Sequence, residues 1–283
     1  KEGGDDGALA SGEEALVEEP ESEDDADEIL QWTPDLIEAK QSAYCRIRSV
    51  LDDADFVTRT LSRLLPSLPL AALPPRGLWL RPPQEWAALA LFLPRDPRAP
   101  PGTPFAISHP NLPLARLAAS HGGIVLVDAA PLASKHSAIE STGKSGDKPQ
   151  LAPPRSLAAR VPLWCALINR AVASVSARGA EWESEVSMHP SVPPDELAHA
   201  RAMVKEWAAA LVATAFADKG GGADALHALA GELHKPLRAL WITRETARRI
   251  AAFPPPSKLP FTPVYCIDPS RPCPQRRSGG ARG

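Results

Sequence analysis

One continuous apolar run constrains the fold of this chain more than any other feature. Residues 123–128 read Gly-Ile-Val-Leu-Val-Asp, without the alternation of apolar and polar residues that marks a half-exposed strand. Such a run is typical of a strand covered on both faces, as in the parallel sheets of α/β proteins. Ligands of these sheets bind beyond the carboxyl ends of the strands. The run therefore predicts a buried strand and makes Asp128 the first candidate site residue.

Helices and short strands are expected on both sides of this run. A proline and acidic residues favour a helix start at 33–35, with apolar residues at helical spacing up to Leu51. A second helix is expected over 55–65. Apolar stripes predict further helices over 162–175 and 194–217. Short strands are expected at 77–80, 88–93, 239–243 and 264–267.

These elements predict an α/β or α+β domain over residues 31–268, built as a mixed sheet of short strands with packed helices. Residues 133–156 are rich in Ser, Gly, Lys and Pro, and we expect them to form a flexible insertion. Residues 1–30 are predicted to be a disordered acidic tail and residues 269–283 a disordered basic tail, because neither segment has enough apolar side chains to form a core.

The net charge of −3 conceals an uneven distribution of charge. Residues 1–28 hold 13 of the 34 acidic residues and one of the 31 basic residues, so the remainder has 30 basic and 21 acidic groups. This surplus of nine positive charges favours a polyanionic partner, such as RNA or a phosphorylated small molecule. A solvated surface balanced by the acidic tail would account for it as well.

Several classes of protein are disfavoured by the composition. The chain has no run of 18 or more apolar residues, and its first residues are acidic. We therefore expect neither a membrane-spanning helix nor a secretory signal, no membrane partner and a cytoplasmic location. Four scattered cysteines do not predict a disulfide framework or a zinc site, and the seven histidines show no metal or catalytic-triad spacing.

Four separated stretches carry a resemblance to one family. The first, residues 46–57, reads Arg-Ile-Arg-Ser-Val-Leu-Asp-Asp-Ala-Asp-Phe-Val, and the second is Arg-Gly-Leu-Trp at 76–79. The third joins the strand at 122–128 to the segment Val-Pro-Leu-Trp-Cys-Ala-Leu-Ile-Asn-Arg at 161–170. The fourth, residues 235–243, reads Lys-Pro-Leu-Arg-Ala-Leu-Trp-Ile-Thr.

In this order the stretches resemble the N-terminal domain of the initiator tRNA 2′-O-ribosylphosphate transferases, or tRNA phosphoribosyl transferases, over residues 40–268. The resemblance implies a glycosyltransferase of the pentosyltransferase class. Its donor would be phosphoribosyl pyrophosphate, accompanied by Mg²⁺, and its acceptor the 2′-hydroxyl of a T-stem adenosine in initiator tRNA. The oligomeric state does not follow from the resemblance.

The chain departs from the family pattern in three respects. Residues 92–98 keep only the Phe and Asp96 of the family's Phe-Lys-Ser-Thr-Asp-Gly-His, and residues 128–131 keep only the Asp of Asp-Ser-Thr-Arg. The family's C-terminal phosphatase-like domain has no counterpart in these residues. Two alternatives therefore stay open. One is a catalytically inactive tRNA-binding derivative, and the other is a truncated or incorrectly predicted gene product, altered around 94–113 and 133–156.

Phosphoribosyl transfer requires an anion-binding cradle and a carboxylate near the acceptor hydroxyl. Asp128 and Asp96 are the candidate catalytic residues, although an Asp after a strand also serves as a cap of the next turn. The candidate substrate-binding residues are basic or amide side chains within the four stretches: Arg46, Arg48, Arg76, Asn169, Arg170, Lys235 and Arg238.

Most of these candidates also have a structural interpretation. Arg46 and Arg48 could pair with the acidic residues that follow them on a solvated helix face. Lys235 and Arg238 could grip RNA phosphates or face water. Asn169, if it faces inward, needs hydrogen-bond partners and could either hold a ligand or fix a loop.

Overall fold

The computed structural model describes residues 34–92, 105–130, 153–176, 185–218, 220–247 and 254–270, together with Arg178, Trp182 and Arg249. The chain divides into two compact units, residues 1–43 and 44–283. In the first, only the start of helix α2 (Pro34–Asp55) is described. The predicted tail 1–30, most of the predicted tail 269–283 and most of the predicted insertion 133–156 lie outside the described residues.

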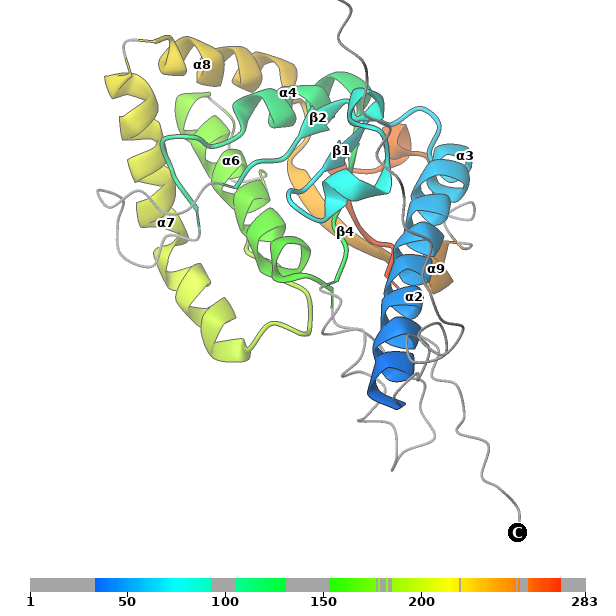
Figure 1. Cartoon of the computed structure of the whole chain (residues 1–283). Coiled ribbons are helices and arrows are strands. Elements are labelled where there is room, and N and C mark those ends of the chain that lie inside the picture. Colours follow the sequence, from blue (N-terminus) through cyan, green and yellow to red (C-terminus); the bar gives the residue numbers. More distant parts are fainter. Residues whose placement is uncertain are drawn as a thin grey trace, which may run out of the picture. The chain divides into compact units, whose positions relative to one another are not determined.

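The second unit contains a five-stranded parallel sheet (Figure 1). Its strands are β1 (Leu70–Ala72), β2 (Ala88–Leu89), β3 (Ile124–Val127), β4 (Leu237–Thr243) and β5 (Thr262–Asp268), in the order β2-β1-β3-β5-β4. The predicted α/β class is confirmed. The sheet is parallel throughout the described strands and not mixed, because every connection between successive strands crosses back to the same end of the sheet.

Two predicted helices are observed almost as expected, as α6 (Val161–Val175) and α7 (Pro194–Ala217). The predicted helix 55–65 continues directly from α2. The remaining helical elements of the second unit are η1 (Phe56–Leu61), α3 (Ser62–Leu64), η2 (Gly77–Leu80), η3 (Pro83–Glu85), α4 (Leu112–His121), η5 (Ser156–Arg160), α8 (Gly222–Glu232), α9 (Arg244–Ala247) and η7 (Pro256–Lys258). None of the described helices is long and apolar enough to cross a membrane.

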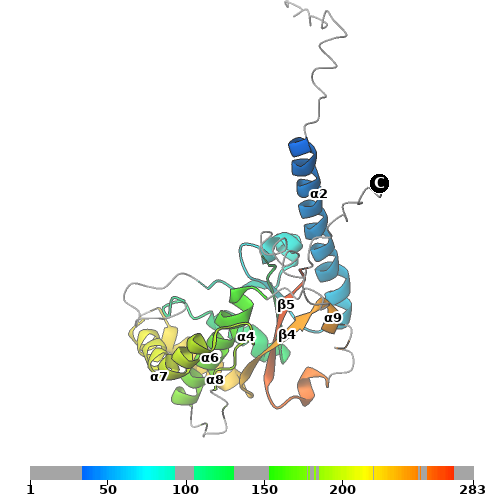
Figure 2. The same cartoon turned by 90° about the horizontal axis from the view of Figure 1, so that it is seen from below.

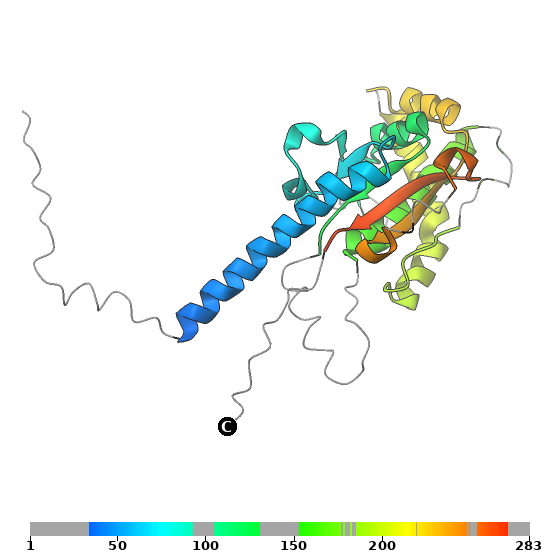
Figure 3. The same ribbon diagram turned by 90° about the vertical axis from the view of Figure 1, so that its right-hand side faces the viewer.

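Successive side chains of the central strands point into two different cores. In β3, Ile124 and Leu126 face the core shared with α4, α6, α7 and α8, whereas Val125 and Val127 face the core that includes η1 and α9. Figure 2 shows α6, α7 and α8 on one side of β4 and β5 and α9 on the other, and Figure 3 shows the same layers from another side. All four residues of β3 are fully buried, which confirms the prediction from the apolar run.

The proline-rich stretch before residue 92 folds differently from the prediction. Residues 77–80 form the 3-10 helix η2 and not a strand, and the strand predicted at 88–93 is only Ala88–Leu89. The strand β1, which has no β-branched residue, was not predicted. It forms because Ala71 pairs with β2 on one side and β3 on the other, so that long-range pairing decides its conformation.

Two buried cysteines are expected to be chemically inert. Cys165 of α6 and Cys266 of β5 are 3% and 1% exposed, and burial raises the pKa of both thiols. Because the thiolate is the reactive form, iodoacetamide at pH 8 should modify the partly exposed Cys45 but neither buried thiol. Peptide mass mapping would locate the label, and alkylation of Cys165 or Cys266 without denaturant would contradict the packing described here.

Candidate functional site

The strand order reverses between β1 and β3. From β1 the chain moves outward to β2, and it then returns to place β3 on the other side of β1. The connections that leave β1 and β3 therefore run in opposite directions. Open parallel sheets bind ligands at this kind of reversal. Two predicted site residues follow these strands, Arg76 after β1 and Asp128 after β3.

Arg76 and Asp128 form an ion pair at this reversal of the strand order. Arg76 Nη2 lies 3.2 Å from Asp128 Oδ2, and Arg76 Nε donates a hydrogen bond to the Ala129 carbonyl at 2.5 Å. The Asp128 side chain is 2% exposed and that of Arg76 is 39% exposed. The carboxylate therefore lies inside, while the guanidinium that contacts it reaches the surface.

Ser156, which the sequence did not indicate, completes the cluster. Its hydroxyl donates a hydrogen bond to Asp128 Oδ2, and the Ala129 N–H donates to Oδ1 at 2.9 Å. Ser156 begins the π-helix η5, which continues into α6, so the helix starts earlier than predicted. Pro153 and Pro154, three and two residues before it, are a helix-start signal that could have located this residue.

The environment of Asp128 shifts its acidity. Burial raises the pKa of the carboxyl group above its ordinary value, although the hydrogen bond from Ser156 and the charge of Arg76 oppose the rise. Carboxylates with a raised pKa are concentrated at functional sites, and they are stronger bases than exposed ones. The ionised Asp128 is therefore suited to accept a proton.

Gly77 allows the turn that carries Arg76 to approach β3. A Cβ atom at this position would lie 2.4 Å from the carbonyl oxygen of Val127. The same oxygen accepts a hydrogen bond from Leu73 N at 2.9 Å, and Gly77 N donates to Leu73 O at 2.9 Å. Because Gly77 has no side chain, this turn can lie against β3, and Arg76 is thereby placed next to Asp128.

The end of β5 adjoins this cluster. Because Val127 pairs with Ile267 in parallel register, Asp128 and Asp268 stand at neighbouring strand ends. Ser270 Oγ accepts a hydrogen bond from Ala130 N at 2.7 Å. In the described part of the chain, no three His, Cys, Asp or Glu residues are grouped so that they could hold a metal ion.

Comparison with protein families matches residues 36–282 to the family described as Rit1 N-terminal domain. The chain belongs to this family. The resemblance to the N-terminal domain of the initiator tRNA phosphoribosyl transferases is thereby confirmed, and membership indicates a role in tRNA modification. No curated protein and no solved structure matches the chain.

Two of the predicted substrate-binding residues, Lys235 and Arg238, lie at the amino end of β4, whereas Arg76 and Asp128 follow the carboxyl ends of their strands. Lys235 Nζ donates hydrogen bonds to the carbonyl oxygens of Ser257 at 2.9 Å and Leu259 at 2.6 Å, so it fastens the segment before β5. The guanidinium of Arg238 lies 5.0 Å from the centroid of the Phe261 ring. The structure therefore does not bring these residues together with Asp128.

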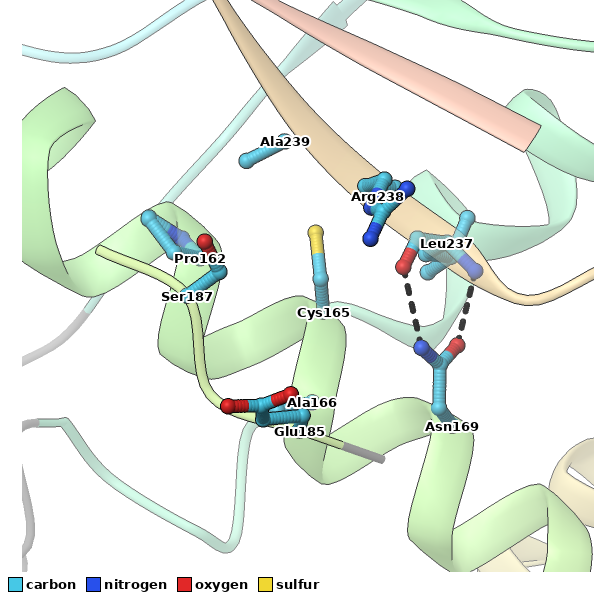
Figure 4. Close-up of a pocket in the computed structure, with 9 residues that line it drawn as sticks. All are labelled: Pro162, Cys165, Ala166, Asn169, Glu185, Ser187, Leu237, Arg238 and Ala239. Carbon is cyan, nitrogen blue, oxygen red and sulfur yellow. Dashed lines mark hydrogen bonds between the residues drawn. The ribbon is translucent and has the colours of Figure 1, made fainter. Parts of the chain in front are cut away.

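Asn169 fastens α6 to β4, as Figure 4 shows. Its Nδ2 donates to the Leu237 carbonyl at 2.9 Å, and its Oδ1 accepts from the Leu237 N–H at 2.8 Å. Asn169 and Leu237 line a small hollow together with Arg238. This hollow lies at the amino end of β4. The neighbouring Arg170 has a buried Nε without a hydrogen-bond partner among the described residues. Of the two functions considered for Asn169, the observed contacts favour fixing the chain.

Replacing Asn169 should therefore affect stability. In Asn169→Asp the acceptor to Leu237 N–H remains, but the donor to Leu237 O is lost and a charge is introduced at a site that is 2% exposed. We expect a loss of about 2 kcal/mol in the free energy of unfolding, measured by urea titration. If donor or RNA binding were lost while the urea midpoint stayed unchanged, Asn169 would be a ligand-binding residue instead.

The remaining predicted site residues are Arg46 and Arg48, which are exposed, and Asp96, which lies outside the described residues. Arg46 lies exposed on α2, and Arg48 Nε lies 3.5 Å from Asp52 Oδ1 on the same helix face. Asp53 is 1% exposed and pairs with Arg244, whose Nη2 lies 3.0 Å from Asp53 Oδ1. The expected pairing with the acidic residues is thus observed for Arg48 and Asp52 only.

Proposed function

We propose that the chain transfers a phosphoribosyl group from phosphoribosyl pyrophosphate to the 2′-hydroxyl of a T-stem adenosine in initiator tRNA. The observation that carries the proposal is the cluster of Arg76, Asp128 and Ser156 at the reversal of strand order, in a chain of the Rit1 family. A guanidinium that reaches the surface beside a buried carboxylate supplies both an anion contact and a proton acceptor.

The chemistry assigns a role to each group. The acceptor 2′-oxygen forms a bond to the anomeric carbon of the donor, and the bond from that carbon to pyrophosphate breaks, so the electron pair leaves with pyrophosphate. Asp128 accepts the hydroxyl proton, for which its raised pKa is an advantage. Arg76 binds a donor phosphate oxygen, and Ser156 keeps the carboxylate oriented.

Mg²⁺ is proposed only as an ion that the donor brings with it. Mg²⁺ is usually held by one or two carboxylates together with substrate phosphates. Both oxygens of Asp128 accept hydrogen bonds from Ala129, Arg76 or Ser156. Asp128 is therefore already engaged within the chain, and the ion is proposed to reach this cluster with the phosphates of the donor.

A second candidate function is tRNA binding without transfer. It is favoured by the turn after β3, where Ala129 and Ala130 stand and their N–H groups already donate to Asp128 and Ser270. These backbone groups are therefore engaged and do not point freely at a phosphate. A binder of this kind would have RNA affinity that falls with salt, but no saturable binding of the donor.

Label transfer separates the two functions. The purified chain would be incubated with phosphoribosyl pyrophosphate labelled in the ribose, Mg²⁺ and unmodified initiator tRNA, with elongator tRNA as the control. Label on initiator tRNA alone supports the transferase. If folded protein binds the tRNA without transferring label or binding the donor, tRNA binding alone is the function.

A further inference from the structure

We propose that Trp79 is a stacking platform for an unpaired base of the RNA acceptor, an inference that rests on the proposed function. Trp79 is 78% exposed, the highest value among the described large hydrophobic side chains that face solvent. Tryptophan is on average one of the more buried residues of folded proteins. An indole held almost fully in solvent beside a candidate site is therefore a binding feature.

The backbone fixes Trp79 in this exposed position. It lies in the 3-10 helix η2, where residues three apart share a side. Gly77 and Leu80 are three apart and both are buried, Gly77 under the Val127 carbonyl and Leu80 in the core next to η1. The intervening Trp79 must face outward, and it cannot turn into the core unless this helix unfolds.

Trp79 lies in the same turn after β1 as Arg76. Trp79 is three residues after Arg76, and its backbone N–H donates a hydrogen bond to the Arg76 carbonyl oxygen, with 3.4 Å between N and O. Leu89, which ends β2, is 46% exposed, and β2 is the strand next to β1. Trp79 and the partly exposed Arg76 thus both follow β1, and the exposed Leu89 ends the neighbouring strand β2. All three lie at the same edge of the sheet.

The charge of the chain and its family favour a nucleobase over a protein side chain as the partner of Trp79. The chain outside its first 28 residues has a surplus of nine positive charges, and its family is one of tRNA modification. Proteins bind unpaired RNA by stacking its bases on aromatic side chains and arginine planes. Because the T-stem adenosine is itself paired, the base that stacks on Trp79 is an unpaired base of the same arm, and this stacking holds the arm next to Arg76 and Asp128.

The test uses Trp79→Ala, Trp79→Phe and the control Phe216→Ala. Phe216 is 53% exposed on α7, where its ring lies 5.6 Å from that of His227. The dissociation constant for a fluorescein-labelled hairpin with the T-arm sequence of initiator tRNA would be measured by anisotropy at two salt concentrations. We expect Trp79→Ala to weaken binding about 5- to 100-fold, Trp79→Phe to retain most of the affinity, and Phe216→Ala to bind normally.

The salt dependence gives a second readout. Because a stacked base releases no counterions, the slope of affinity against salt should be equal in Trp79→Ala and the wild type. Wild-type affinity in Trp79→Ala, or self-association of the wild type that this variant abolishes without affecting RNA, would overturn the inference. Absence of label transfer by the wild type, together with weakened hairpin binding by Trp79→Ala, would refute the transferase and keep the stacking role.

Discussion

Asp128→Asn is expected to reduce phosphoribosyl transfer at least about 100-fold and to remove a pH dependence from the stability of the protein. The loss of activity follows from the removal of the proton acceptor, which contributes about 10²- to 10⁴-fold in general base catalysis. The pH dependence follows from the raised pKa, because burial disfavours the charged form of this carboxyl group in the folded chain.

The sign of the pH dependence follows from linkage. Between the ordinary carboxyl pKa of 3.8 and the raised pKa, the folded chain binds more protons at Asp128 than the unfolded chain does. The contribution of this group to the free energy of unfolding is therefore complete below pH 3.8 and is lost as the pH rises through the raised pKa. Asparagine does not titrate, so Asp128→Asn should become more stable relative to the wild type between pH 4 and pH 7.5.

Urea titrations at pH 4.5 and pH 7.5, combined with the label-transfer assay, would measure both effects. Asp224→Asn is a matched control, because Asp224 is exposed in the first turn of α8, remote from the carboxyl end of β3. Asp224→Asn should change neither the transfer activity nor the difference in the free energy of unfolding between pH 4.5 and pH 7.5. A variant Asp128→Asn that is less stable at pH 7.5 than at pH 4.5, relative to the wild type, would refute the raised pKa.

The central strands could be predicted from the sequence, but the edge of the sheet could not. The run at 123–128 indicates a buried strand by itself, since its apolar stretch is short, rich in β-branched residues and follows two glycines. The sequence Leu-Ala-Ala of β1 has no comparable local signal. It becomes a strand through hydrogen bonds to residues more than 15 positions away, and such pairing is invisible to local patterns.

In the candidate site, too, local motifs indicate single residues, whereas their arrangement depends on long-range pairing. Arg76 and Asp128 could be identified separately from their motifs, but only the strand order makes them neighbours, because they are 52 residues apart. Ser156 was missed because the composition around it favours a flexible insertion. Lys235 and Asn169 were included as polar residues of a motif, whereas their observed partners are backbone groups of the chain itself.

Gly77→Ala is expected to lower the free energy of unfolding by about 3 kcal/mol and to abolish donor binding. The added Cβ would lie 2.4 Å from the Val127 carbonyl oxygen, a backbone atom in a fully buried strand. Because β3 is fixed by pairing with β1 and β5, the turn that carries Arg76 has to move instead. Overpacking of this kind typically costs about 1–3 kcal/mol, and the backbone contact places Gly77→Ala at the upper end.

Thermal unfolding would show the destabilisation as a decrease in Tm of about 6–12 °C, because about 1 kcal/mol shifts a domain of this size by roughly 2–4 °C. Gly231→Ala in α8 is the control, since its Cβ would have no atom within 4 Å. That substitution should raise stability slightly through helix propensity. Donor titrations on both variants would separate the effects: wild-type donor affinity in Gly77→Ala would show that the position of Arg76 does not matter for the donor, and the proposed site would then be wrong.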